Sequence, residues 1–409
     1  MKLGQNKIHI ALITTWFPPE IGVAVQRMVS FKEYLTTETS KVSVFTIADS
    51  KTNVFINEFE NVYREKNTCL FKPIKEKISD SKFLHYSKVL YNILLTKVIS
   101  NEYKNWSKKI LVKLNEINKN EKIDIIISSF APSVTHEVAF KFKSRNPAVK
   151  WIVDMRDEMS FNPDISNKLK FEYEKIERKI NDNADAFISV SKPIIEKYKP
   201  IFNNIKCFEE IRNGFNHSVK PKIKFNEIFT IVYSGTFYGK SKPDFFFKAL
   251  ELLINDKLID NFKINFIGTY NNFYIPENIK KHISFLGYCD NKNLIYSLLD
   301  ADALLLILPN NNRVGVYSGK IFEYISVKKP IIAILNKEDV AAALINEYKA
   351  GYCANYNDID EIKNSILFAY NIWKNREQIG LSSEEIYKLH RKYQIEKLLK
   401  LVYSLNSEI

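Results

Sequence analysis

The feature that most constrains the fold is a regular alternation of short apolar runs with amphipathic helical patterns along nearly the whole chain. Helical patterns such as 167–183 place apolar residues on one face and lie between the runs. The runs are rich in β-branched and aromatic residues and are bounded by turn residues, so each is a predicted strand. They span 8–15, 42–47, 123–128, 150–154, 186–190, 229–234, 263–267, 282–285, 303–308 and 330–335. Alternating strands and helices predict an α/β fold whose parallel sheets are covered on both sides.

The strands fall into two series, and the short polar stretch 213–228 separates them. At about 100–200 residues per domain, 409 residues correspond to two or three domains. We therefore predict two doubly wound, Rossmann-like domains, 1–215 and 228–383. The final stretch, 384–409, contains a predicted helix that no strand follows.

Composition excludes several classes of protein. With 45% hydrophobic residues the chain is not disordered, and with 11 glycines it is neither collagen-like nor a flexible linker. No apolar run is long enough for a transmembrane helix, and the apolar start at 8–13 reads as a strand rather than a signal peptide. Four scattered cysteines without a CxxC pair fit a reducing cytoplasm, where we expect the protein.

The formal charge of +13 points to an anionic partner, although lysine-rich compositional drift explains it equally well. Stretch 82–114 carries seven lysines against one glutamate, together with an apolar stripe that includes Trp106 and Ile110. Such a helix either lies on an anionic membrane surface or buries its stripe in the core and leaves its lysines in water. Nucleic acid is not an expected partner, because no nucleic-acid-binding motif accompanies the charge.

Glycine-containing loops follow several predicted strands. Gly22 lies between the first strand and the next helix, and Gly235 and Gly268 follow later strands. Backbone N–H groups at such a loop bind anions, and ligands of open α/β sheets bind at the carboxyl ends of the strands. Each loop alone is also compatible with a plain turn.

Stretch 317–325 has the most chemical content. Ser318 is a predicted N-cap, and Gly319 and Lys320 fall in the first turn, where a phosphate is favoured. Glu323 lies one turn further on and suits the diol of a ribose. The alternative is a surface pair between Lys320 and Glu323.

Five motifs in this order resemble GT-B glycosyltransferases of family 4, of the capsule, lipopolysaccharide and exopolysaccharide type. They lie at 16–22, 154–157, 211–216, 233–236 and 319–324. The resemblance implies two Rossmann-like domains facing each other across a cleft, with the last helix packed back on the first domain. It also implies a nucleotide-sugar donor on the C-terminal domain, an acceptor on the N-terminal domain, retention of anomeric configuration and no metal or other cofactor.

Residue roles follow from the same resemblance. Those implied for catalysis are His136 at the donor sugar, Asp157 in the cleft, Lys240 at the phosphate and Glu323 at the ribose. Arg156 and Glu20 are implied on the acceptor side. The implied donor-binding residues are Gly22, Gly235, Thr236, Lys242, Gly268, Arg313, Ser318, Gly319 and Lys320.

The chain departs from the family at two points. Gly315 stands where the family has the first glutamate of a Glu-x7-Glu motif, and the family's phosphate-binding arginine has no clear match. We suggest Arg313 as its substitute. We therefore predict a transferase that moves a sugar from a nucleotide-sugar donor to a glycan or lipid-linked acceptor in surface polysaccharide synthesis. We expect residues 82–114 to bind the protein peripherally to the inner face of the cytoplasmic membrane. Two alternatives have the same fold. They are a nucleotide-sugar epimerase and a nucleotide-sugar-binding protein that has lost catalysis.

Overall fold

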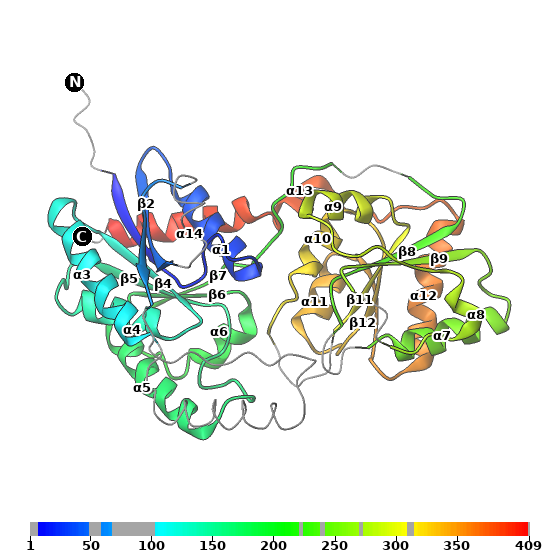
Figure 1. Ribbon diagram of the computed structural model, residues 1–409, viewed down its shortest axis with the longest axis horizontal. Helices are drawn as coiled ribbons and strands as arrows, with labels where there is room; N and C mark the ends of the chain where they lie inside the picture. The colour runs from blue at the N-terminus through cyan, green and yellow to red at the C-terminus, as the bar shows by residue number, and fades with distance from the viewer. Residues whose placement is uncertain are drawn as a thin grey trace.

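The computed structural model describes residues 7–48, 59–67, 103–220, 224–237, 242–269, 273–308 and 315–407. These residues form two α/β domains, each built on a parallel sheet with helices on both faces (Figure 1). The predicted fold class is confirmed.

The N-terminal sheet has seven strands in the order β3-β2-β1-β4-β5-β6-β7, all parallel. The strand order reverses between β1 and β4, and ligands of such sheets bind outside the carboxyl ends of the strands at that switch point. The strands are β1 (Ile8–Ile13), β2 (Ser40–Ala48), β3 (Val62–Lys66), β4 (Ile125–Phe130), β5 (Lys150–Met155), β6 (Ala186–Ser189) and β7 (Cys207–Glu210). The helices are α1 (Val23–Leu35), α3 (Lys104–Asn120), α4 (Val134–Lys143), α5 (Asn167–Asn183) and α6 (Lys192–Tyr198).

The C-terminal sheet has six parallel strands in the order β10-β9-β8-β11-β12-β13, with its switch point between β8 and β11. The strands are β8 (Phe229–Ser234), β9 (Phe262–Ile267), β10 (Ile283–Phe285), β11 (Ala303–Ile307), β12 (Ile331–Ile334) and β13 (Gly351–Ala354). The helices are α7 (Asp244–Asn255), α8 (Glu277–Lys280), α9 (Asn291–Leu299), α10 (Lys320–Ser326), α11 (Val340–Glu347) and α12 (Ile359–Lys374).

Burial explains which strands the sequence predicts. All ten predicted strands are present, and central ones such as β1 and β11 are buried along their whole length. The three that the prediction missed, β3, β7 and β13, are all edge strands. Both β3 (VYREK) and β7 (CFEE) are only half-buried, so they lack the apolar run that marks a central strand.

The last helices return the chain to the N-terminal domain. After α13 (Ser383–Tyr387), α14 (Arg391–Asn406) lies along α1, as the red helix over the N-terminal sheet shows (Figure 1). Ile395, Leu398 and Val402 join the same buried cluster as Met28 and Phe31 of α1. The chain therefore crosses between the domains twice, before β8 and after α12, and a bridge between Phe215 and His390 joins the two crossings.

Helix α3 contains the described part of the lysine-rich stretch, and residues 82–102 lie outside the described ranges. Trp106, Ile110 and Leu114 are fully buried in the N-terminal core. Lys104, Lys108 and other polar residues occupy the exposed side. In this part of the stretch the apolar stripe belongs to the core. None of the described helices is both long and apolar enough to span a membrane.

Candidate functional site

A lysine side chain lies over a glycine at the carboxyl end of β8. The strand ends at Ser234, and Gly235 follows with φ +111°, which favours glycine. An ideal Cβ on Gly235 would lie 2.6 Å from Cε and 2.8 Å from Nζ of Lys320, the first residue of α10. Gly268, after β9, borders the same position, because its added Cβ would lie 3.7 Å from Cα of Gly235. The glycines make room for the lysine.

The Lys320 ammonium group is largely shielded from water and has neutral neighbours. Its Nζ donates to the hydroxyl of Tyr233 at 3.1 Å and lies 4.4 Å from the centre of that ring. No carboxylate forms an ion pair with it among the described residues. Burial lowers the pKa of Lys320 to about 8. A shielded cation without an acidic partner is suited to an anionic ligand.

Glu323, one turn after Lys320, faces a cavity of about 420 Å³ between the domains. Gln26 of α1, Asn291 of α9 and Arg391 of α14 also line this cavity. Burial raises the pKa of Glu323, and the charge of Arg391 opposes that effect. The Glu323 carboxylate and the Lys320 ammonium group thus come from the same short helix, α10.

Arg391 joins three parts of the molecule at this cavity. Its Nε donates to the backbone oxygen of Asn213 at 3.0 Å, and its Nη2 donates to Oε1 of Gln26 at 2.6 Å. Burial lowers the pKa of Arg391 to about 10, and Glu323 opposes the shift. The arginine therefore holds α14, the first crossing and α1 together beside Glu323.

The N-terminal domain approaches α10 closely. Gly22 precedes α1 with φ +143°, and open space surrounds the position of an added Cβ. Gly319, just before α10, would place a Cβ only 2.6 Å from Cγ2 of Val23. Nearby, Ser191 donates its hydroxyl to the backbone oxygen of Gly315 at 2.6 Å. The loop 315–319 thus packs on the N-terminal domain, and Gly315 has neighbours where a larger residue would clash.

A buried ion pair anchors the N-terminal side. Arg27 of α1 donates to both oxygens of Asp154, at 2.7 and 3.2 Å, and to the backbone oxygen of Ile211 at 2.7 Å. Ser129 also donates to Asp154, at 2.7 Å. Asp154 is thus held inside the N-terminal domain by Arg27 and Ser129.

Arg156 and Asp157 line a small interdomain cavity of about 130 Å³ with Ala24, Asn213 and Tyr317. Arg156 donates from Nε to the backbone oxygen of Phe130 at 2.6 Å and lies 5.9 Å from the ring centre of Trp16. Burial lowers the pKa of Arg156. These contacts hold the guanidinium group at the edge of the cleft.

His136 does not reach the cleft in this conformation. Its side chain is fully buried, its Nδ1 lies 2.8 Å from Oγ of Ser128, and the ring of Phe130 stacks near it. Burial lowers the pKa of His136 to about 3, so the imidazole is neutral. The side chain packs in the core, its Nε2 has no hydrogen-bond partner among the described residues, and its implied role at the donor sugar stays a prediction.

The other predicted site residues are dispersed. Lys240 and Arg313 lie outside the described residues. Glu20, Thr236 and Lys242 are exposed, and the backbone of Lys242 is tied to Tyr356 beyond β13. The predicted N-cap at Ser318 is wrong, because α10 begins one residue later with Gly319 as its N-cap and no side-chain cap hydrogen bond.

Sequence analysis missed Tyr233, Arg27 and Arg391. Tyr233 lies in a buried strand, so the sequence predicts it as a core residue. Nothing in the sequence indicates that its hydroxyl contacts Lys320. Arg27 could have been suspected, since an arginine on the first helix after a glycine loop faces the sheet edge. Arg391 gave no signal, because its position depends on the return of the last helix.

Comparison with known proteins identifies the architecture as the GT-B fold of glycosyltransferases. Sucrose-phosphate synthase from Thermosynechococcus elongatus matches with a TM-score of 0.62 at 13% identity, over 97% of this chain and 100% of that chain. The lipopolysaccharide outer core galactosyltransferase WaaB matches with a TM-score of 0.59 at 12% identity, over 97% and 99%. TarM from S. aureus, solved in complex with UDP, matches with a TM-score of 0.60 at 12% identity, over 96% and 99%.

Within this fold, residues 214–385 match the family model described as "Glycosyl transferases group 1". Residues 214–385 of the chain are thus similar to the group 1 glycosyltransferase domain. Lys320, Glu323, Gly235 and Gly268 all lie inside the matched range. No curated protein sequence matches the chain significantly.

Proposed function

We propose that this glycosyltransferase moves a sugar from a nucleoside-diphosphate donor to a glycan or lipid-linked acceptor in surface polysaccharide synthesis. The observation that carries the proposal is the shielded Lys320 ammonium group over Gly235, in a group 1 glycosyltransferase domain. A cation held in this way stabilises charge that develops on a leaving diphosphate.

In the proposed reaction the bond between the anomeric carbon and the diphosphate oxygen breaks, and an acceptor hydroxyl oxygen bonds to that carbon. The nucleoside diphosphate departs with the bonding electrons, and the hydroxyl proton passes to a diphosphate oxygen. Lys320 stabilises the departing oxygens as a point charge. Glu323 accepts hydrogen bonds from the ribose diol in the adjoining cavity, where the charge of Arg391 opposes the rise that burial causes in the pKa of the carboxyl group.

The acceptor lies against the N-terminal domain in this proposal. Arg156 and Asp157 line the small interdomain cavity, and Asp157 is the carboxylate best placed there to orient an acceptor hydroxyl. We include retention of anomeric configuration, which the family resemblance implies, with Gly315 in place of the family glutamate. The net charge of +13 supports a site of action at the inner face of the cytoplasmic membrane.

The test begins with thermal shifts for a panel of nucleoside diphosphates and their sugars, since a ligand at about 100 times its Kd adds about 2.7 kcal/mol of stability. Turnover is then measured with the donor that binds, in the wild-type chain and in Glu323→Ala. We expect one donor to bind and the variant to lose turnover. Interconversion of the donor without an acceptor would indicate an epimerase, and full turnover by the variant would refute the role of Glu323.

A further inference from the structure

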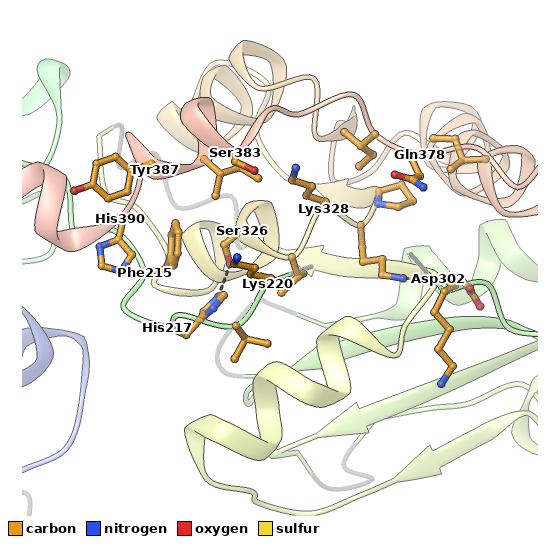
Figure 2. A pocket seen from close by; sticks show the side chains of 18 of the residues that line it. Phe215, His217, Lys220, Asp302, Ser326, Lys328, Gln378, Ser383, Tyr387 and His390 are labelled. Atoms are coloured by element: carbon orange, nitrogen blue, oxygen red, sulfur yellow. Dashed lines mark hydrogen bonds between the residues drawn. The ribbon is translucent and has the colours of Figure 1, made fainter. Parts of the chain in front are cut away.

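A larger cavity, of about 690 Å³, lies at the other end of the C-terminal sheet (Figure 2). Its lining includes Asp302 and Pro330, which immediately precede β11 and β12. Gly235 and Gly268, by contrast, follow β8 and β9. Because all strands of the sheet are parallel, this cavity lies at the amino ends of the strands, and the Lys320 site lies at their carboxyl ends. We call it the linker cavity.

Both crossings between the domains form the wall of the linker cavity. Phe215 and His217 come from the first crossing, and Tyr387 and His390 come from the second, on the same side of the cavity in Figure 2. The backbone of Phe215 bonds with Leu389 and Arg391, which fixes the crossings to each other. Residues 217–219 also line the cavity that contains Glu323, so a single segment separates the two cavities.

The apolar part of the lining is extensive. The ring of Phe215 packs edge-on against His390, and Val219, Ile379 and Ile386 add aliphatic surface. His217 is held by a 2.7 Å hydrogen bond between its Nε2 and Oγ of Ser326, drawn in Figure 2. A cavity of this size lies within the range of about 300–1,000 Å³ that is typical of small-molecule sites.

The charged part of the lining is cationic. The lysines are Lys220, Lys224, Lys328 and Lys329, and the carboxylates are Asp302 and Glu377. Lys224 forms an ion pair with Asp300 outside the lining at 3.0 Å, so three other lysines stand against two carboxylates. Asp302 is already occupied, because it accepts hydrogen bonds from the backbone amides of Asn226 and Thr230.

The lysines differ in how far they are already engaged. Lys329 is 8% exposed, and its Nζ donates to the backbone oxygen of Lys224 at 3.1 Å. Lys220 and Lys328 have no ion-pair partner within the described part of the chain. Two cations without an ion-pair partner among the described residues thus line a cavity that also offers an extensive apolar surface.

We propose that the linker cavity binds a phosphate ester with a compact apolar body, at a second site separate from that of the sugar donor. Lys220 and Lys328, which have no ion-pair partner in the described part of the chain, supply two positive charges for a phosphate dianion, and lysines bind phosphate as point charges. The apolar body packs against Phe215 and Ile386. The phosphate belongs either to a soluble metabolite or to a lipid headgroup, and both share this chemistry.

The test uses the full chain with Lys320→Met, so that binding at the diphosphate site does not obscure the result. Isothermal titration with phenyl phosphate compares Lys220→Glu/Lys328→Glu with a control pair, Lys263→Glu/Lys281→Glu. Both control lysines are exposed residues of the same domain outside the cavity, and the change in charge is equal. We expect saturable binding with one site per chain, at least tenfold weaker in the cavity pair and unchanged in the control pair.

Ser383→Trp provides a second variant, because Ser383 is an exposed residue on the cavity wall and a tryptophan there fills space without removing charge. We expect it to weaken phenyl phosphate binding as well. Inorganic phosphate, which lacks the apolar body, should bind more weakly than phenyl phosphate.

Phosphatidylglycerol vesicles distinguish the two sources of phosphate. Vesicle binding that is weaker for Lys220→Glu/Lys328→Glu but unchanged for Lys263→Glu/Lys281→Glu supports a lipid headgroup. An equal fall in both pairs assigns vesicle binding to net charge, and specific phenyl phosphate binding then supports a soluble ligand. If neither probe distinguishes the pairs, the proposal is overturned. Nucleoside-diphosphate binding by the wild-type chain is measured separately, so this result does not depend on the proposed transferase activity.

Discussion

Lys320 is the residue on which the chemistry of the site depends most. The sequence places it after a glycine in the first turn of a predicted helix, and this predicts an anion site. What the sequence did not contain was the path of the side chain, which crosses to β8 and lies over Gly235 beside Tyr233. That path depends on the packing of α10 against β8, which no local pattern records.

The lowered pKa of Lys320 makes nucleoside-diphosphate affinity depend on pH. Below about pH 8 the free lysine is charged, and above it the proton must be taken up on binding. Affinity should therefore fall by up to about tenfold per pH unit above pH 8. Lys320→Arg should remove this decline, since arginine stays protonated. Titrations at pH 7, 8 and 9 test this, and an identical decline in the arginine variant would exclude Lys320 as its source.

Gly235→Ala tests whether the glycine makes room for the lysine. The new Cβ would meet Cε of Lys320 at 2.6 Å and displace the ammonium group, so diphosphate affinity should fall at least tenfold. Gly287→Ala is the matched control, because φ there is +65° and the space around it is open. Both variants pay backbone strain of about 1–3 kcal/mol. Equal affinities in the two variants would refute the contact.

At the scale of elements, burial decided what the sequence could predict. Nine of the ten predicted strands are central, with apolar runs, and the tenth, β10, is a partly exposed edge strand whose ISF sequence is still apolar enough to predict. The edge strands β3 (VYREK) and β7 (CFEE) were missed because they carry polar residues, and β13 (GYCA) was missed because it is short and lacks β-branched residues. The last helix was predicted as a helix, but its partner α1 lies far away in the sequence.

Helix α14 should contribute strongly to the stability of the N-terminal domain. Leu398 is fully buried in the cluster shared with α1, and Leu398→Ala should cost about 2–5 kcal/mol. Lys400→Ala, at an exposed position of the same helix, should change stability by less than about 0.5 kcal/mol. Urea unfolding of both variants measures the difference. Equal stabilities would mean that α14 is not part of this core.

At the scale of the whole molecule, the two domains approach each other closely at two glycines. At each of them, atoms of the N-terminal domain leave little room for a side chain. Gly319 faces Val23, and Gly315 faces Ser191 and Ile194. This contact brings the loop before α10 to the N-terminus of α1. The sequence marked both glycines, one within a motif and one as a departure from it, yet their contacts depend on how the domains face each other.

Gly319→Ala should disturb this domain contact. The added Cβ would lie 2.6 Å from Cγ2 of Val23 but 3.8 Å from its Cβ, which is an ordinary contact distance. Turnover should therefore fall about tenfold or more in Gly319→Ala and recover when Val23→Ala is added, which removes the clashing methyl group. Failure of the double variant to recover would show that Gly319 acts in some other way.

The most direct test of the central claim is calorimetric titration of a panel of nucleoside diphosphates into the wild-type chain and into Lys320→Met, at pH 7. The account predicts that one base is preferred and that the methionine variant binds its diphosphate at least tenfold more weakly, with an unchanged fold by circular dichroism. Binding of equal strength in both proteins, or no binding of any nucleoside diphosphate to the wild-type chain, would contradict the assignment of Lys320 to the leaving diphosphate.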